Sequence, residues 1–320
     1  MIRRIGFLMA FSFASAMASA QAGYPARPIR IVVPFPPAGA TDVVSRLIAD
    51  RVGANNPSWT IVVENKPGAG GNIGLETVAK AKPDGYTIGM GQTANIAINP
   101  ALYSTMPYDA MKDFVPIALI AEQPLVVIVN AGSSYKTLAE LVAAGKSKPL
   151  TMASAGNGTV GHLAGELFAR RAGVTITHVP YKGAAAALTD VMGGRIDFMM
   201  PTPQAALPLI KGAKLRALAV TSLRRVDAIG EVPTIAESGY PEFVAIDWKA
   251  LVAPAGTPAD IVARLRLEIE RVLQQPATME RMAAEGSSPM RGSSVEIARF
   301  IRAEHERWGT VVRDANVKLD

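Results

Sequence analysis

Three glycines, Gly156, Gly158 and Gly161, follow the spacing G-x-G-x-x-G, which is typical of a turn that binds a dinucleotide where a strand leads into a helix. Such a site also needs an acidic residue about 20 positions further on, because a carboxylate binds the ribose hydroxyls. That region reads VTITHVPYK, and no carboxylate follows before Asp190. We therefore expect no nicotinamide cofactor, and we expect these glycines to let a small carboxylate approach the backbone.

Other signatures of catalysis are incomplete. The run SSYK at 133–136 fits S-x-x-K, but neither K-T-G nor S-D-N accompanies it, and AGKS at 144–147 lacks a glycine that a P-loop requires. The three histidines, His162, His178 and His305, are far apart in sequence, and the chain has no cysteine, so nothing indicates a zinc site. No nucleophile, base and orienting group can be assembled, and we expect no catalytic residue, metal or cofactor.

The N-terminus predicts export. Arg3 and Arg4 precede an apolar stretch over residues 5–18, and ASA at 18–20 offers an A-x-A cleavage site before Gln21. This order is typical of a signal peptide, here residues 1–20, and the apolar part is too short to span a bilayer. The absence of cysteine excludes a lipid-anchored start and disulfides. We expect a soluble periplasmic protein after cleavage.

The composition limits the class of partner. The full chain carries a net charge of +6, and removal of Arg3 and Arg4 leaves 31 basic against 27 acidic residues, or +4. This small excess is spread along the chain, and aromatic residues make up only 6%, so no nucleic-acid surface is indicated. A weakly positive protein is better suited to small anions. A chain of this length exceeds what one core usually holds, so two domains are expected.

Short apolar strands alternate with helices along the chain. The run IRIVVPF at 29–35 leads through small residues into the helical pattern VVSRLIADRV at 43–52, and the same order returns from residue 149 onwards. This alternation predicts parallel sheets covered on both faces. Residues 257–271 are predicted to form an amphipathic helix with Thr257 at its N-cap.

Two strand-to-helix junctions consist mainly of small residues. We call FPPAGATD at 35–42 the first loop and SAGNGTVGH at 154–162 the second loop. In open α/β sheets a ligand lies beyond the carboxyl ends of the strands, where the N–H groups of a helix start favour an anion. We therefore expect an anion-binding edge on each domain and a cleft between the two edges.

The sequence resembles a known family along most of its length. The run YPARPIRIVVPFPPAGATDVVSRLIADRV, which begins at Tyr24, is similar to the start of mature solute receptors of tripartite tricarboxylate transporters, the Bug receptors. The runs VVENKPGAGGNIGLETVAKAKPDGYTIGMG, SAGNGTVGHLAGELF, HVPYKGAAAALTDVMGGRIDFMM and VPTIAESGY continue the resemblance in order. It implies a fold like that of type II periplasmic binding proteins, with two Rossmann-like α/β domains around a central cleft.

The resemblance also implies a site. Family members hold a ligand carboxylate through bridging waters and backbone groups from two loops, which correspond here to residues 35–41 and 154–159. The first of these loops often carries consecutive glycines, whereas this chain has Pro37, Ala38, Gly39 and Ala40. The extra methyl groups are expected to narrow that side of the cleft.

Backbone donors are expected from residues 39–41, with the Thr41 hydroxyl in addition, and side-chain donors from Ser154, Asn157 and Thr159. His162 is expected on a helix face beside the second loop or in a hydrogen bond to the ligand. Tyr181 either forms the floor of the cleft or packs in the core. The candidate ligand-binding residues are Phe35, Ala38, Gly39, Ala40, Thr41, Gln92, Thr93, Ser154, Gly156, Asn157, Gly158, Thr159, His162, Tyr181 and Thr202.

The sequence thus favours a monomeric periplasmic receptor for a small organic acid: a dicarboxylate, a tricarboxylate, an acidic amino acid or an aromatic acid. Its partners are expected to be integral-membrane transporter subunits, and no nucleic acid. Residues 24–122 and 223–320 are expected to form domain 1, and residues 123–222 domain 2. The alternative is a secreted α/β enzyme that acts on an ester or amide in the same cleft, and release of the bound ligand unchanged distinguishes a receptor from it.

Overall fold

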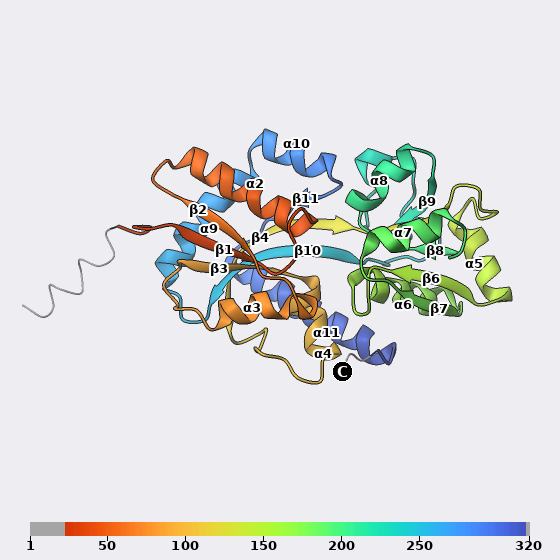
Figure 1. Cartoon of the computed structure of the whole chain (residues 1–320), viewed down its shortest axis with the longest axis horizontal. Helices are drawn as coiled ribbons and strands as arrows, with labels where there is room; N and C mark the ends of the chain where they lie inside the picture. The colour runs from red at the N-terminus through yellow and green to blue at the C-terminus, as the bar shows by residue number, and fades with distance from the viewer. Residues whose placement is uncertain (1–22, 318–320) are drawn as a thin grey trace, which may run out of the picture.

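The computed structural model describes residues 23–317, and its strands form two separate sheets (Figure 1). The predicted signal peptide and its cleavage site lie outside the described residues. The α/β class predicted from the alternating strands and helices is confirmed. Every pairing among β1, β2 and β3, and among β6, β7 and β8, is parallel, as the βα order requires.

The first sheet combines segments from both halves of the chain. In it β10 lies between β3 and β4 and runs antiparallel to both. The strands in spatial order are β11 (Ser288–Pro289), β4 (Phe114–Pro124), β10 (Ile246–Pro254), β3 (Thr87–Gln92), β1 (Ile29–Val33) and β2 (Ile61–Asn65).

The second sheet comes from one continuous stretch of the chain. Its β5 runs antiparallel to both neighbours, β8 and β9. The strands in spatial order are β7 (Ile176–Pro180), β6 (Leu150–Ser154), β8 (Phe198–Met199), β5 (Val126–Asn130) and β9 (Leu215–Val220).

The helices cover both faces of each sheet, and the buried side chains show which face each helix covers. On the first sheet, α2 (Ala40–Asn55), α9 (Ala259–Leu273) and α10 (Pro276–Ala284) bury side chains in one cluster. The opposite face carries α3 (Asn72–Ala79), α4 (Asn99–Leu102) and α11 (Ser294–Asp314), together with the π-helical turn η2 (Thr93–Ile98).

This second cluster continues into the other sheet. It takes in Val127 and Val129 of β5 with α5 (Leu138–Ser147) and α6 (Val160–Ala172), whereas Val126 and Ile128 point to the opposite face, which α7 (Ala184–Met192) and α8 (Pro203–Lys211) cover. The short 3-10 helices η1 (Ala69–Gly71) and η3 (Asp227–Ile229) lie in connections.

The chain passes between the sheets along two adjacent paths. Strand β4 ends at Pro124 and β5 begins at Val126, so one nearly continuous strand enters the second sheet, and the segment between β9 and β10 returns. Thr221 joins the two paths, because its Oγ1 accepts the Leu125 N–H at 2.7 Å and its N–H donates to the Leu125 carbonyl. The side chain of Thr221 is fully buried.

The direction of the crossing strand fixes what lies between the sheets. Since β4 runs towards the second sheet and β10 is antiparallel to it, β3 and β1 also end on the side that faces the second sheet. By the same reasoning β5 runs away from the first sheet, so β8, β6 and β7 end facing it. The carboxyl ends of the parallel strands in the two sheets therefore face each other.

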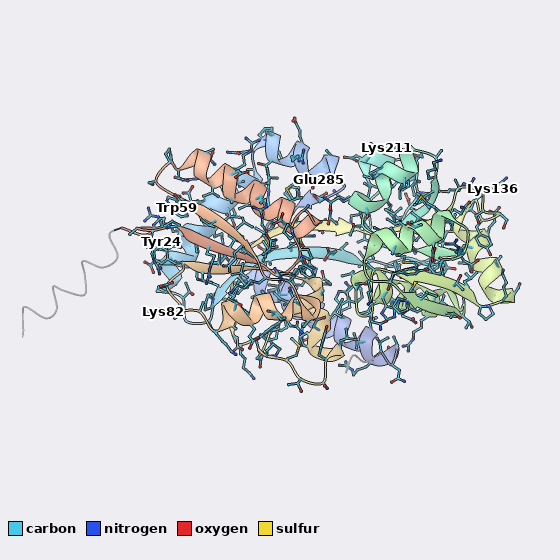
Figure 2. All side chains as sticks on the ribbon, in the orientation of Figure 1. Tyr24, Trp59, Lys82, Lys136, Lys211 and Glu285 are labelled. Carbon is cyan, nitrogen blue, oxygen red and sulfur yellow. The ribbon has the colours of Figure 1, made fainter. Side chains whose placement is uncertain are left out.

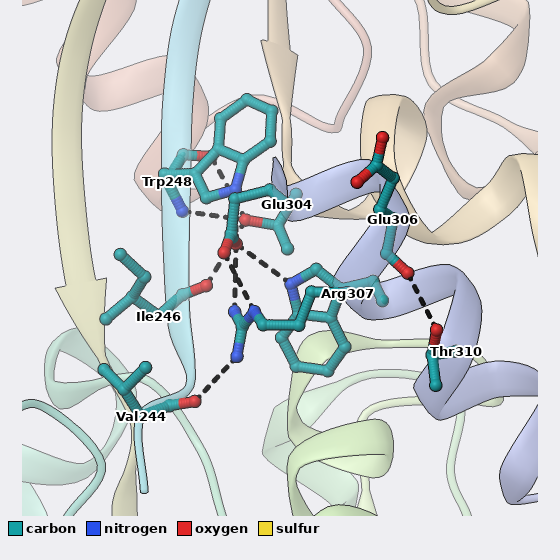
Figure 3. Close-up of polar contacts among 9 residues, drawn as sticks. Val244, Ile246, Trp248, Glu304, Glu306, Arg307 and Thr310 are labelled. Atoms are coloured by element: carbon teal, nitrogen blue, oxygen red, sulfur yellow. Dashed lines mark hydrogen bonds and ion pairs between the residues drawn. The ribbon is translucent and has the colours of Figure 1, made fainter. Parts of the chain in front are cut away.

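A buried carboxylate anchors the returning path to the C-terminal helix (Figure 3). Glu304 on α11 accepts the indole N–H groups of Trp248 and Trp308 at 3.0 and 3.1 Å. Arg307 donates to the same carboxylate and, through a second nitrogen, to the carbonyl of Val244 at 2.8 Å. The segment that enters β10 is thereby held against α11.

The predicted N-cap of the helix over residues 257–271 was one residue too early. Helix α9 begins at Ala259, with Pro258 in the N-cap position. Thr257 instead donates its hydroxyl to the carbonyl of Pro254 at 2.8 Å, so it stabilises the preceding turn.

Candidate functional site

The first loop connects β1 to α2 and is held by one buried side chain. Asp42 is 2% exposed, and its carboxylate accepts the Ala38 N–H at 2.9 Å, the Asn65 amide at 2.9 Å and the Arg46 guanidinium. Burial alone raises the pKa of Asp42, but the hydrogen bonds from Arg46, Asn65 and Ala38 outweigh burial and hold it below its ordinary value. Asp42 therefore fixes the loop rather than facing a ligand.

The backbone of the first loop differs in detail from the expectation. Gly39 has φ −77° and is the N-cap of α2, whereas Ala38 adopts the left-handed region at φ 64°. The Ala38 N–H donates to Asp42, so this member of the candidate set has no free backbone donor. The first N–H groups of a helix have no intrahelical partner, and α2 begins at the end of β1 that faces the second sheet.

Three of the predicted polar residues form hydrogen bonds to one another or to β10. The Thr41 hydroxyl donates to Gln92 Oε1 at 2.6 Å, and both side chains are buried. Thr93 Oγ1 accepts the N–H of Trp248 on β10 at 2.8 Å. The Phe35 ring packs towards the turn at η1, where a Cβ on Gly71 would lie 3.0 Å from its Cζ. These contacts hold Thr41, Gln92 and Thr93 behind the first loop, and we call these three residues the wall behind the first loop.

The second loop connects β6 to α6, and its glycines serve distinct purposes. Gly156 and Gly158 have φ angles of +147° and +72°, which residues other than glycine rarely adopt. A Cβ on Gly161 would lie 2.5 Å from the carbonyl oxygen of Met200, so this glycine lets α6 approach the end of β8. The G-x-G-x-x-G spacing here thus reflects turn geometry and helix packing.

Two histidines that are far apart in sequence brace the second loop. His162 and His178 stack with ring centroids 3.6 Å apart and planes 12° apart. The Gly158 N–H donates to His162 Nδ1 at 3.1 Å, so His162 holds the loop from within the protein and is 3% exposed. Of its two expected roles, the structure shows His162 buried on the helix face.

Ser154 connects this pair to the loop backbone. Its hydroxyl oxygen lies 2.9 Å from the Gly156 carbonyl oxygen and 2.6 Å from His178 Nε2, and its single hydrogen serves one of these two contacts. Burial, followed by the nearby His162, lowers the pKa of His178 from 6.5 to about 4. His178 is therefore neutral near pH 7, and the hydroxyl hydrogen of Ser154 is used within the protein.

The remaining candidates differ in how far their polar atoms are occupied. The Tyr181 hydroxyl donates to Asp190 at 2.6 Å, and its ring packs beside the core of the second sheet, which favours the packing role. Thr159 is the N-cap of α6, and its hydroxyl donates to the Gly156 carbonyl. The side chains of Asn157, which is exposed, and Thr202 at the start of α8 make no hydrogen bond within residues 23–317.

The structure brings both loops to the facing carboxyl edges of the two sheets. No hydrogen bond or ion pair joins residues 35–42 to residues 154–162 in the described part of the chain. The larger cavities lie elsewhere: one of about 430 Å³ beside the two connecting paths and one of about 410 Å³ between α6 and α11. A cavity of about 10 Å³ adjoins Ala40 at the start of α2.

Sequence reasoning missed a charged cluster on the connecting strands. Lys249 on β10 is 1% exposed, and its Nζ lies 3.1 Å from both Gln123 Oε1 on β4 and Asp247 Oδ2. The signal was present as two opposite charges inside the apolar run FVAIDWKALVAP. Lys249 also lines the small cavity beside Ala40.

Two features are absent from residues 23–317. No helix there combines the length and the apolar character needed to cross a bilayer. No group of three or more histidine, aspartate or glutamate side chains in the same range is arranged to hold a metal ion.

Comparisons with known proteins extend over nearly the whole chain. The family model described as "Tripartite tricarboxylate transporter family receptor" matches residues 44–317. Protein BugT of Bordetella pertussis (strain Tohama I) is 39% identical over 318 residues, which cover 98% of this chain and 97% of BugT.

Two similar solved structures contain an organic acid. R. palustris Rpa4515 with adipate has a TM-score of 0.84 at 35% identity, and the match covers 92% of this chain and 99% of that one. MatC (Rpa3494) from Rhodopseudomonas palustris with bound malate has a TM-score of 0.78 at 33% identity, with 90% and 100% covered.

Proposed function

Because this chain belongs to the tripartite tricarboxylate transporter receptor family, we propose that it binds a small organic acid in the periplasm and delivers it to integral-membrane transporter subunits. The observation that carries the proposal is the placement of two helix starts, those of α2 and α6, at the facing edges of the sheets. Backbone N–H groups and helix dipoles at both edges favour a negatively charged group between them. The relatives solved with adipate and malate support a carboxylate as that group.

The donors in this proposal are mainly backbone groups. On the first loop they are the N–H groups of residues 39–41, and on the second loop Asn157 adds an unoccupied side-chain amide. Thr41, Gln92 and Ser154 act behind them, because their polar atoms already bond to protein. Hydrogen bonds to a charged group contribute about 1.5–3 kcal/mol each, so a few such contacts suffice for tight binding.

We further propose that residues 24–122 and 223–320 form one domain, with residues 123–222 as the other, and that they move about the two connecting paths. The strand passage at Pro124–Val126 and the Thr221–Leu125 hydrogen bonds mark the hinge. A hinge of two adjacent strands lets packed domains close on a ligand with little internal change.

The experiment is a thermal-shift screen of the mature protein over dicarboxylates, tricarboxylates, acidic amino acids and aromatic acids. A ligand that binds only the folded state stabilises it by about 2.7 kcal/mol at 100 times its Kd, which shifts the melting temperature measurably. Calorimetry then gives the affinity, and mass spectrometry of the recovered ligand is expected to find it unchanged. Chemical conversion of the ligand, or no shift with any acid, would contradict the receptor proposal.

A further inference from the structure

The charged cluster on the connecting strands has incomplete hydrogen bonding. The ammonium group of Lys249 carries three hydrogens, and the structure provides acceptors for two of them, Gln123 Oε1 and Asp247 Oδ2. The second carboxylate oxygen, Asp247 Oδ1, is buried and has no hydrogen-bond partner. A buried charge or polar atom without a hydrogen-bond partner destabilises the fold. A cluster with one unused donor and one unused acceptor is therefore suited to bind a further hydrogen-bonding group.

The cluster lies next to the wall behind the first loop. Lys249 is the register partner of Gln92 on β3, and directly opposed residues of an antiparallel pair point to the same face. Gln92 in turn accepts the Thr41 hydroxyl, and Ala40 at the start of α2 lines the same small cavity as Lys249. A carboxylate held by the N–H groups of residues 39–41 therefore has Lys249 as a near neighbour.

One hydroxyl group matches the unused donor and acceptor. The two oxygens of a carboxylate are about 2.2 Å apart, so Asp247 Oδ1 lies within about 5.3 Å of Lys249 Nζ, which two hydrogen bonds through one oxygen can span. A hydroxyl accepts from lysine and donates to aspartate, whereas an ammonium group would be repelled by lysine and a methylene offers neither bond. The cavity of about 10 Å³ that Lys249 and Gln123 line is about the size of one oxygen atom, and it adjoins the lysine side of the cluster.

The cover over the cluster lies at the seam between the two sheets. The segment after α10 reaches α8, where a Cβ on Gly286 would lie 2.4 Å from Pro203 Cβ. Figure 2 shows Glu285, the neighbouring residue, at the end of α10 that faces the second sheet. Because this contact joins elements of different sheets, movement of the sheets apart uncovers the cavity.

We propose that Lys249 and Asp247 form a selectivity subsite for a hydroxyl group on the bound acid, so that the ligand class is hydroxy-carboxylic acids. The inference rests on the proposed function, because it places the subsite beside the carboxylate held at the first loop. Gln123 orients the lysine, and it contacts the ligand only through that lysine.

The test is calorimetry of the mature protein with pairs of acids that differ by one hydroxyl: malate and succinate, 2-hydroxyglutarate and glutarate, citrate and tricarballylate, mandelate and phenylacetate. The wild type is expected to bind the hydroxy member of its best pair at least tenfold more tightly. Lys249→Met and Asp247→Asn are expected to reduce that preference to less than threefold. Arg281→Met is the matched control, because Arg281 borders the same cavity but pairs with Glu285, and it is expected to retain the preference.

Three outcomes would overturn the inference. Equal affinities within every pair in the wild type would show that the cluster holds water or is structural, and would leave the proposed function intact. Binding confined to acids without a hydroxyl would have the same meaning. No binding of any carboxylate would overturn the proposed function as well. The wild-type comparison decides the matter even if a variant fails to fold, which circular dichroism would reveal.

Discussion

The first and second loops occupy equivalent positions at facing sheet edges, yet different chemistry holds them. The first loop is braced by an ionised carboxylate, Asp42, which accepts hydrogen bonds from Arg46, Asn65 and the loop backbone. The second loop is braced by two stacked imidazoles, His162 and His178, of which the latter has a lowered pKa. In both loops the residues that fix the backbone lie behind the small residues that face the gap.

The largest expected effect comes from removing the carboxylate brace. Asp42→Ala leaves the donors of Ala38, Asn65 and Arg46 without their acceptor, and it is expected to lower the free energy of unfolding by about 2–3 kcal/mol. Urea unfolding at pH 7 measures the loss, and Asp42→Asn, which keeps one acceptor, is expected to lose less. A change of about 0.5 kcal/mol or less would show that the first loop holds its shape without the carboxylate.

A second comparison places valine in each loop. Gly156→Val is expected to weaken binding of the best acid by more than tenfold, about 1.4 kcal/mol, because φ +147° strains any side chain there. Gly39 has φ −77°, and a Cβ there would meet only the Pro36 carbonyl at 3.5 Å, so Gly39→Val is expected to fold normally and to lose less affinity. Calorimetry on both variants measures this difference. Equal losses of affinity would show that the added side chain blocks the approach of the ligand at both positions, and that the backbone conformation of Gly156 is not the cause.

Sequence patterns predicted the architecture well because the fold follows from local rules. Alternating strands and helices predicted the parallel strands β1–β3 and β6–β8. The expectation of wholly parallel sheets was wrong, because β10 and β5 run antiparallel to their neighbours. The sequence does not show the purpose of Gly161, which is to let α6 pack against Met200.

The sequence did not predict the side-chain contacts that depend on the tertiary structure. The Thr41 and Ser154 hydroxyls were expected to face the ligand, but Thr41 donates to Gln92, which is distant in sequence, and Ser154 bonds within its own loop. The stacking of His162 on His178 depends on α6 packing beside β7, which no spacing of histidines reveals. Likewise, Lys249 and Asp247 read as ordinary strand residues until β10 is placed between β3 and β4.

The two braces are expected to respond to pH in different ranges. The folded pKa of His178 is about 4 and its ordinary value 6.5, so between these values the unfolded chain binds a proton that the folded chain does not. Stability is therefore lost as pH falls from about 6.5 towards 4. The lowered pKa of Asp42 keeps its contribution intact until the pH falls below its ordinary value of 3.8.

Urea unfolding of the wild type and His178→Gln at pH 7, 6 and 5 measures the histidine contribution. The variant is expected to show a smaller decrease in unfolding free energy over this range. The same decrease in both proteins would assign the pH dependence to other groups and remove this distinction between the loops.

The smallest expected effect tests whether side chains or backbone groups hold the ligand. Asn157 is exposed and makes no hydrogen bond within residues 23–317, so Asn157→Ala is expected to change the free energy of unfolding by less than about 0.5 kcal/mol. Its affinity is expected to fall by less than tenfold, because Asn157 is exposed and water can replace its hydrogen bond to the ligand. Thr41→Ala is the matched control on the first loop: it removes the buried bond to Gln92 and is expected to lower stability by about 1 kcal/mol. If Asn157→Ala abolished binding, the second loop would hold the ligand through a side chain, and it would differ in this from the first loop, whose donors are backbone groups.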